Sequence, residues 1–231
     1  MALFAISDLH LDMTGNKPMD VFGDNWIGHY KKIESNWKKK ITCGDTVIIA
    51  GDISWSMNMK NGFLDLDWVH NLPGEKILVK GNHDYWWNSI TKLNSLYDDM
   101  NFIQNNFFSY GNYALCGTRG WNCPGSENFS SHDEKIYKRE LLRMRNSLDC
   151  AARAGYDKFI VAIHYPPIGE KFMDSGFKDI FEEYSVEKVI YGHLHGESSL
   201  KAVTGNLNGV EYLLTSSDYI NFDPEVILPG R

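Results

Sequence analysis

The sequence lacks any long hydrophobic run. Over its 231 residues, no apolar stretch approaches the roughly 20 residues that a helix needs to cross a bilayer. The N-terminal run ALFAI at positions 2–6 is short, follows no basic segment and leads directly into Ser7 and Asp8, which is not the pattern of a signal peptide. These absences argue against a membrane protein, and we expect a cytoplasmic location.

Cysteine is scarce and shows no metal-binding or redox pattern. The chain has four cysteines, at Cys43, Cys116, Cys123 and Cys150, and none of them forms a C-x-x-C pair. A zinc knuckle and a thiol redox motif are therefore not indicated. In a reducing compartment these residues are expected to be free thiols.

An excess of positive charge is also missing. Lysine and arginine number 23 against 30 aspartates and glutamates, for a net charge of -7. This balance argues against binding to duplex nucleic acid, although a local basic groove stays open. We find no repeat, linker or low-complexity tract, so the length predicts a single domain over 1–231. The composition gives no indication of the oligomeric state.

Several short apolar runs end in a cluster of polar residues. The five clearest runs are residues 3–6, 46–50, 76–79, 159–163 and 188–191. Continuous β-branched runs of this length predict strands buried on both faces. Helical spacing of apolar residues fills 27–41, 90–96 and 137–148, which predicts an α/β layered fold. Near the end of the chain, 199–203 and 210–215 flank a turn-like segment at 205–209 and predict a hairpin.

The residues at these strand ends are of the types that bind metals. In α/β sheets, ligands bind beyond the carboxyl ends of the strands, so we expect the polar clusters to meet along one sheet edge. Asp8 and His10 are two residues apart and would face the same side of an extended chain. Asp52 follows a glycine that permits close backbone approach. The set of candidate ligands is Asp8, His10, Asp52, Asn82, His164, His193 and His195.

This set suits the hydrolysis of a phosphate ester. The reaction needs hydroxide near neutral pH and a counter-charge for the phosphoryl oxygens, and two metal ions roughly 3.5–4 Å apart supply both. Carboxylate, imidazole and amide groups are suitable ligands for manganese, iron or zinc. Each residue alone has a simpler explanation, such as a capped turn or a core histidine. Their joint occurrence at successive strand ends predicts a metal site.

The motifs resemble those of the calcineurin-like metallophosphoesterase superfamily. They are Asp8-x-His10, Gly51-Asp52, Gly81-Asn82-His83-Asp84, His164 and Gly192-His193-x-His195, in the family order. The resemblance covers most of the chain. It implies a sandwich of two mixed β-sheets flanked by helices, with a dinuclear metal centre at one sheet edge.

The resemblance also implies roles for single residues. The first ion would take Asp8, His10, Asp52 and His195. The second would take Asp52, Asn82, His164 and His193, so that Asp52 bridges, and a bridging hydroxide would be the nucleophile. His83 would not bind metal but would face the leaving group or a phosphoryl oxygen. Asp84 would orient the His83 ring, as carboxylates often do for imidazoles.

Other residues near these motifs have two readings. Arg119 follows the apolar run 113–116 and would clamp a phosphate with its planar side chain, or it is a surface arginine in a glycine-rich turn. The basic residues between Lys135 and Arg145 form a solvated helix face or a substrate contact. Trp86 and Trp87 are better explained as core residues than as residues that line a pocket.

The sequence thus predicts a metal-dependent hydrolase of phosphate mono- or diesters. At the second motif, the stretch Gly51–Met57 lacks the carboxylate and arginine of the protein serine/threonine phosphatases, which disfavours that branch. A nuclease is one alternative, and the acidic balance counts against it. A non-catalytic binding module on the same fold is another, and the complete ligand set with His83 counts against that.

Overall fold

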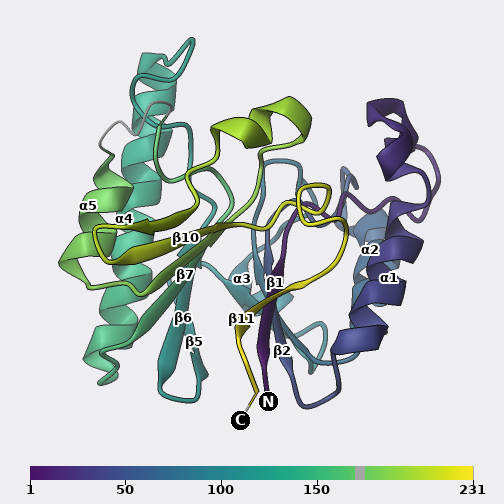
Figure 1. Ribbon diagram of the computed structural model, residues 1–231, viewed down its shortest axis with the longest axis horizontal. Helices are drawn as coiled ribbons and strands as arrows, with labels where there is room; N and C mark the ends of the chain where they lie inside the picture. Colours follow the sequence, from purple (N-terminus) through teal and green to yellow (C-terminus); the bar gives the residue numbers. More distant parts are fainter. Residues whose placement is uncertain (170–174, 231) are drawn as a thin grey trace.

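The computed structural model describes residues 1–169 and 175–230. Within this part of the chain, two β-sheets face one another and helices cover their outer sides (Figure 1). The first sheet has five strands and the second has six, and both mix parallel and antiparallel pairs. The predicted fold class, a sandwich of two mixed sheets flanked by helices, is confirmed.

The first sheet is built mainly from the N-terminal half of the chain. Its strand order is β11 (Glu225–Leu228), β1 (Leu3–Ile6), β2 (Thr46–Ala50), β3 (Glu75–Val79) and β4 (Met100–Ile103). Strands β1 to β4 run parallel, whereas β11 pairs antiparallel with β1. The carboxyl ends of β1, β2 and β3 therefore point to the same edge of the sheet.

The second sheet is built from the C-terminal half. Its order is β5 (Phe107–Tyr110), β6 (Tyr113–Thr118), β7 (Phe159–Ile163), β8 (Lys188–Tyr191), β10 (Val210–Leu214) and β9 (Gly205–Leu207). The inner strands β6, β7, β8 and β10 are parallel, and the two outer strands are antiparallel to their neighbours.

The helices lie on the outer faces of the two sheets (Figure 1). Beside the first sheet are α1 (His29–Lys40), α2 (Met59–His70) and α3 (Ile90–Leu93), and beside the second are α4 (Ser131–Arg153) and α5 (Gly176–Glu183). The short 3-10 helices η1 (Met19–Phe22), η2 (Asp24–Trp26) and η4 (Gly196–Lys201) belong to the loops. No helix of the described residues has both the length and the apolar character needed to span a bilayer.

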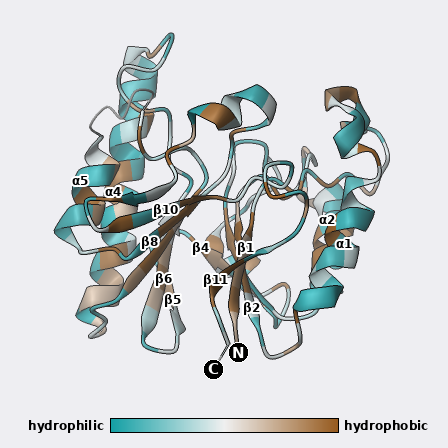
Figure 2. Cartoon of the chain, in the orientation of Figure 1, coloured by the Kyte–Doolittle hydropathy of each residue, from teal (hydrophilic) through white to brown (hydrophobic). Residues whose placement is uncertain are grey.

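Three apolar layers hold these elements together. One lies between the first sheet and its helices and contains Trp37 and Trp86, and a second lies under α4 and α5 and contains Phe177. The third joins the two sheets through residues such as Ile48 and Ile160. Strands such as β1, β2 and β7 are accordingly buried along their whole length. The strands are coloured mainly as hydrophobic, whereas the helices contain many hydrophilic residues (Figure 2).

Two expectations about local structure need correction. The first strand of the predicted hairpin lies at Gly205–Leu207, and 199–201 belongs to η4 instead. The reason is that the turn uses only Asn208 and Gly209, both at positive φ, so that the strands pair up to Leu207 and Val210. The helix predicted over 90–96 is also shorter, since α3 ends at Leu93.

Candidate metal centre

The polar strand ends meet in the space where the two sheets open at one end of the molecule. The loops after β1 and β2 are joined by hydrogen bonds from Asp8 N to Gly51 O (2.9 Å) and from His10 N to Asp52 O (3.0 Å). In the second sheet, Gly192 N donates to His164 O (3.1 Å). The predicted ligands therefore come together, but from two facing sheets and not from one edge alone.

The candidate ligands leave the strands through an unusual backbone conformation. Asp8, His10, Asp52 and His193 have φ values of 58°, 45°, 51° and 74°. The side chains of Asp8 and His10 do face the same group, as expected, but the backbone between them is not extended, because the chain turns at both residues. Non-glycine residues in this region cost about 1–3 kcal/mol each and gather at functional sites.

The first group of candidate ligands consists of Asp8, His10 and His195, whose ligand atoms all lie within 4.8 Å of one another. The Nε2 atoms of His10 and His195 are 3.3 Å apart, and Asp8 Oδ1 is 3.4 Å from His195 Nε2. Asp8 is completely buried and His10 nearly so.

The second group consists of Asp52, His164 and His193, again within 4.8 Å. His164 Nε2 lies 3.3 Å from His193 Nδ1 and 3.4 Å from Asp52 Oδ2. Asn82 Oδ1 is 2.8 Å from the same His164 nitrogen, which adds an amide oxygen to this group. Asp52 Oδ2 is also 3.9 Å from His10 Nε2, so that this carboxylate lies between the two groups.

Two of the histidines, His164 and His195, are held in the orientation that a metal requires. His164 Nδ1 donates to the carbonyl of Ala50 (3.1 Å). His195 Nδ1 donates to the carboxylate of Asp218 (2.7 Å). In both rings, Nε2 is therefore left facing the centre of its group. Metal-binding histidines are typically oriented in this way through their second nitrogen.

The electrostatics of the cluster favour a cation. Burial opposes charge on His195, but Asp8 and Asp218 outweigh it and raise the pKa of this ring to about 10. For His164, Asp52 and Asp8 outweigh burial and raise the pKa to about 9. Burial likewise opposes ionisation of Asp8, yet His195 and the other nearby rings hold the pKa of Asp8 well below its usual range. Metal ions would displace these protons, since metal binding requires deprotonated ligands.

Two glycines of the motifs are needed for this packing. A Cβ on Gly51 would lie 2.5 Å from His164 Nδ1, and its φ of 93° also disfavours other residues. A Cβ on Gly192 would collide with the carboxylate of Asp8 and with Ser7. Larger residues would therefore push apart the side chains that form the two groups.

The family model of the calcineurin-like phosphoesterases matches residues 1–197, most of the chain. This chain belongs to the calcineurin-like phosphoesterase family. The family consists, in general terms, of metal-dependent phosphoesterases, and the two ligand groups are candidate sites for the divalent metals that the family uses.

Individual relatives are more distant. The phosphopantetheinyl hydrolase of Mycobacterium tuberculosis is 16% identical, with a TM-score of 0.60, and the alignment covers 99% of this chain and 96% of that one. A Thermus thermophilus protein, TT1561, is 10% identical with a TM-score of 0.55, covering 84% and 81%. These likenesses concern the fold. The Gene 66 protein of Mycobacterium phage L5 is 35% identical over 78 residues, which are 34% of this chain and 37% of that protein.

His83 lies beside the two ligand groups of the phosphoesterase. Its backbone N donates to Asp52 Oδ1 (2.8 Å), while its ring Nε2 is 4.0 Å from Asp52 Oδ2. The ring packs against Trp55 with centroids 4.1 Å apart, and its side chain is 31% exposed. It thus points toward the opening of the site without joining either ligand group.

Asp84 does not occupy the position that the resemblance suggested. Its carboxylate accepts hydrogen bonds from Ile53 N (2.9 Å), Ser54 N (3.1 Å), Gly81 N (2.7 Å) and Trp86 Nε1 (3.1 Å). No hydrogen bond to the His83 ring is found among the described residues. We therefore revise its role: Asp84 joins the loops that carry Asp52 and Asn82, because all its acceptors are used there.

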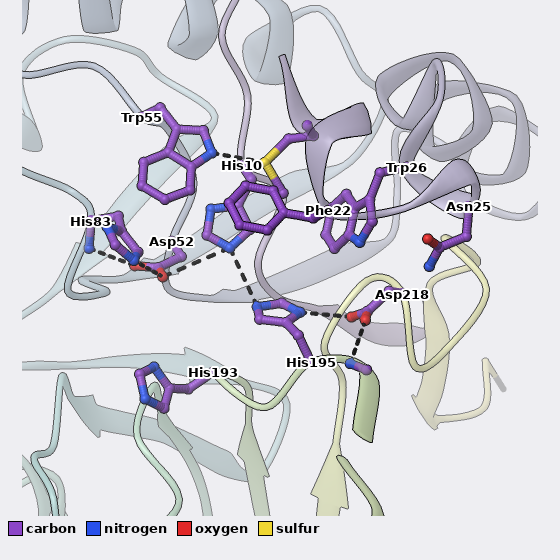
Figure 3. A pocket seen from close by; sticks show the side chains of 12 residues that line it. His10, Phe22, Asn25, Trp26, Asp52, Trp55, His83, His193, His195 and Asp218 are labelled. Atoms are coloured by element: carbon purple, nitrogen blue, oxygen red, sulfur yellow. Dashed lines mark hydrogen bonds and ion pairs between the residues drawn. The ribbon is translucent and has the colours of Figure 1, made fainter. Parts of the chain in front are cut away.

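Three residues around the centre were missed at the level of sequence. Asp218 orients His195 and also accepts from Gly196 N (3.0 Å). Trp55 stacks on His10 at 4.8 Å, and Trp26 contacts the edges of His10 and His195 (Figure 3). Trp86, by contrast, is a buried core residue, in line with the first reading of it.

Arg119 lies at the end of β6 but is engaged by its own neighbours. Its guanidinium is 4.5 Å from the Trp121 ring centroid and 3.6 Å from Glu140. Its backbone oxygen accepts hydrogen bonds from His164 N (3.1 Å) and Tyr165 N (3.0 Å), which joins the loop after β6 to the residues that follow β7. The buried Nε has no partner among the described residues. A phosphate-clamping role stays a prediction.

Proposed function

We propose that this protein hydrolyses phosphate mono- or diesters with two divalent transition-metal ions, with manganese, iron and zinc the best-suited metals. One observation carries the proposal: two groups of nitrogen and oxygen ligands, most of them buried, lie side by side, and the Asp52 carboxylate lies between them. When bound, such ions supply an activated water for attack on phosphorus and offset the charge on the phosphoryl oxygens.

The side chains at the centre would have two different roles, metal binding and proton transfer. Asp8, His10 and His195 would hold one ion, and Asn82, His164 and His193 the other, with Asp52 shared by both. Burial lowers the pKa of His83 below its usual value. Histidine is the side chain that most often acts as a general acid or base, and His83 would carry the proton here. Because His83 faces the opening and not a ligand group, it would give its proton to the departing oxygen of the ester.

Arg119 would assist if its side chain turns toward the phosphoryl group. Its unpartnered Nε supports this proposal, and its contacts with Trp121 and Glu140 compete with it. An Arg119→Lys variant should then keep its metal content and lose roughly ten-fold in kcat/KM. Equal kcat/KM values in variant and wild type would leave Arg119 as a purely structural residue.

The test of the proposal is metal stoichiometry together with activity. Manganese-loaded protein should contain two ions per chain and cleave p-nitrophenyl phosphate or its bis ester. Asp52→Asn should lose both ions, because it removes the shared carboxylate. Asp12→Asn is the matched control, since Asp12 lies in the loop after β1 and accepts hydrogen bonds from Thr14 and Lys17 of that same loop. A ratio that never exceeds one ion per chain in excess manganese would refute the two-metal arrangement.

A nuclease is the main competing hydrolase. None of the described residues that line the recess at the metal centre is a lysine or an arginine, which disfavours a nucleic-acid backbone as the substrate. Single-stranded DNA belongs in the same substrate screen, and cleavage that falls steeply with salt would favour the nuclease. A single domain over 1–231 and a cytoplasmic location stay predictions.

A further inference from the structure

An aromatic recess opens directly beside the candidate metal centre. It has a volume of about 380 Å³. Candidate ligands form its floor, among them His10, Asp52 and His195, and His83 lies at one side (Figure 3). The rest of the wall is formed by Met19, Phe22, Trp26 and Trp55, of which Trp55 packs against His83. We call this space the aromatic recess.

The inner part of the wall is fixed in place. Trp26 is only 3% exposed, and its ring meets the rings of His10 and His195 at centroid distances of 5.9 and 5.6 Å. Trp55 Nε1 lies 3.0 Å from the sulfur of Met19, so that the wall residues also support one another. The surface that a ligand would meet is therefore largely preformed, which lowers the cost of binding.

The outer part of the wall is exposed. Phe22, on η1, lines the recess and is nevertheless 64% exposed. A large apolar side chain at the mouth of a cavity marks a surface that a ligand can cover. No lysine or arginine lines the recess among the described residues, so its chemistry suits an apolar group and not a second phosphate.

We propose that the aromatic recess binds the alcohol portion of the substrate, and that this portion carries a flat aromatic ring. The inference rests on the proposed function, which places the reacting phosphoryl group at the metal ligands. His83 lies next to the metal ligands and also next to the aromatic recess. The ester oxygen that it would protonate therefore lies where the two meet. A cavity of about 150 Å³ can hold benzene. A recess of about 380 Å³ therefore has room for a ring next to a phosphoryl group.

Aromatic walls favour such a ring over an alkyl chain of similar size. Ring pairs in edge-to-face or offset contact gain energy beyond the burial of apolar area. The rings of Phe22 and Trp55, which line the recess and are less buried than Trp26, offer these contacts. A substrate with only a short alkyl group would leave most of the wall in contact with water.

The test compares benzyl phosphate with ethyl phosphate on manganese-loaded full-length protein. Both release alkoxides of similar basicity, so a difference reports the ring and not the leaving-group chemistry. We expect kcat/KM to be roughly ten- to a hundred-fold higher for benzyl phosphate. Phe22→Ala should lower this ratio several-fold. Val21→Ala is the matched control, because Val21 is 73% exposed on the same turn but does not line the recess.

A binding experiment separates this inference from the proposed function. Benzylphosphonate and ethylphosphonate cannot be hydrolysed, and calorimetry should show the same preference for the benzyl compound, reduced by Phe22→Ala. If neither phosphate is cleaved, the proposed function fails while the phosphonate pair still decides on the recess. Equal binding of the two phosphonates, no binding of either, or a preference that Phe22→Ala leaves unchanged would overturn the inference.

Discussion

The Asp84 carboxylate gives a sharp test of how the metal-site loops are held. It is fully buried and accepts four hydrogen bonds, from Ile53 N, Ser54 N, Gly81 N and Trp86 Nε1. Asp84→Ala removes every one of these acceptors at once. An unsatisfied buried donor costs about 1–3 kcal/mol. Water that enters the space left by the carboxylate would accept hydrogen bonds from some of the four donors. We therefore expect a loss of about 3–5 kcal/mol in the free energy of unfolding.

Urea unfolding of metal-free protein is the appropriate assay, because bound ions would add their own stabilisation. Asp12→Ala serves as the control. Its carboxylate also accepts from backbone groups, at Thr14 N and Lys17 N, but it is only partly buried. Exposed groups regain hydrogen bonds from water, so the control should lose about 1 kcal/mol.

The same variant should disturb the metal centre. Ile53 and Ser54 follow Asp52 directly, and Gly81 precedes Asn82, so the loops that lose their anchor carry two candidate ligands. We expect weaker manganese binding in Asp84→Ala than in Asp12→Ala. A stability loss below about 1 kcal/mol, or equal losses in the two variants, would refute the anchoring role of Asp84.

Three further predictions concern single side chains. His83→Asn should keep both ions and lower kcat by roughly 10²–10⁴-fold, with a larger loss for alkyl phosphates than for p-nitrophenyl phosphate, as steady-state kinetics would show. Asp218→Asn should weaken the ion at His195 by roughly 10–100-fold in a manganese titration, because it removes the acceptor that orients that ring. Burial lowers the pKa of His29 below its usual 6.5, and its Nε2 donates to the Leu9 carbonyl (3.0 Å). Below pH 6.5 the unfolded chain binds a proton at His29 more readily than the folded chain does. The stability that neutral His29 contributes above that pH is therefore lost as the pH falls. The stability gap between wild type and His29→Gln should narrow from about pH 7 to about pH 5 in urea unfolding.

Much of the fold could be predicted because buried parallel strands leave a strong mark in sequence. The runs at 3–6, 46–50 and 159–163 coincide with β1, β2 and β7. Strands at the sheet edges were not predicted. Strand β5 (Phe107–Tyr110) lies at an edge with its residues only partly buried, and β11 (Glu225–Leu228) has an exposed valine in the middle. The apolar runs in these two strands are only two and three residues long, so pattern alone does not find them.

The candidate metal ligands were visible in the sequence because their chemistry restricts the residue types at fixed places after each strand. Their backbone conformation was not visible. The residue types at positions 8 and 52 do not predict that Asp8 and Asp52 have a positive φ, because that conformation is imposed by hydrogen bonds between neighbouring loops. The role of Asp84 was misjudged for the same reason: two of its four partners, Ile53 and Ser54, lie 31 and 30 residues away in the chain.

The residues that would select a substrate are harder to predict than those that would hold the metals. Trp26 and Trp55 belong to loops after different elements, and no spacing links them to each other or to Asp218. They meet at His10 and His195 only because β1, β2 and β8 end at the same place (Figure 3). Metal binding constrains the floor of the site to a few ligand types, whereas the wall can be built from any side chains of suitable shape. The sequence therefore points to the class of reaction, and the alcohol of the ester must be inferred from the assembled wall.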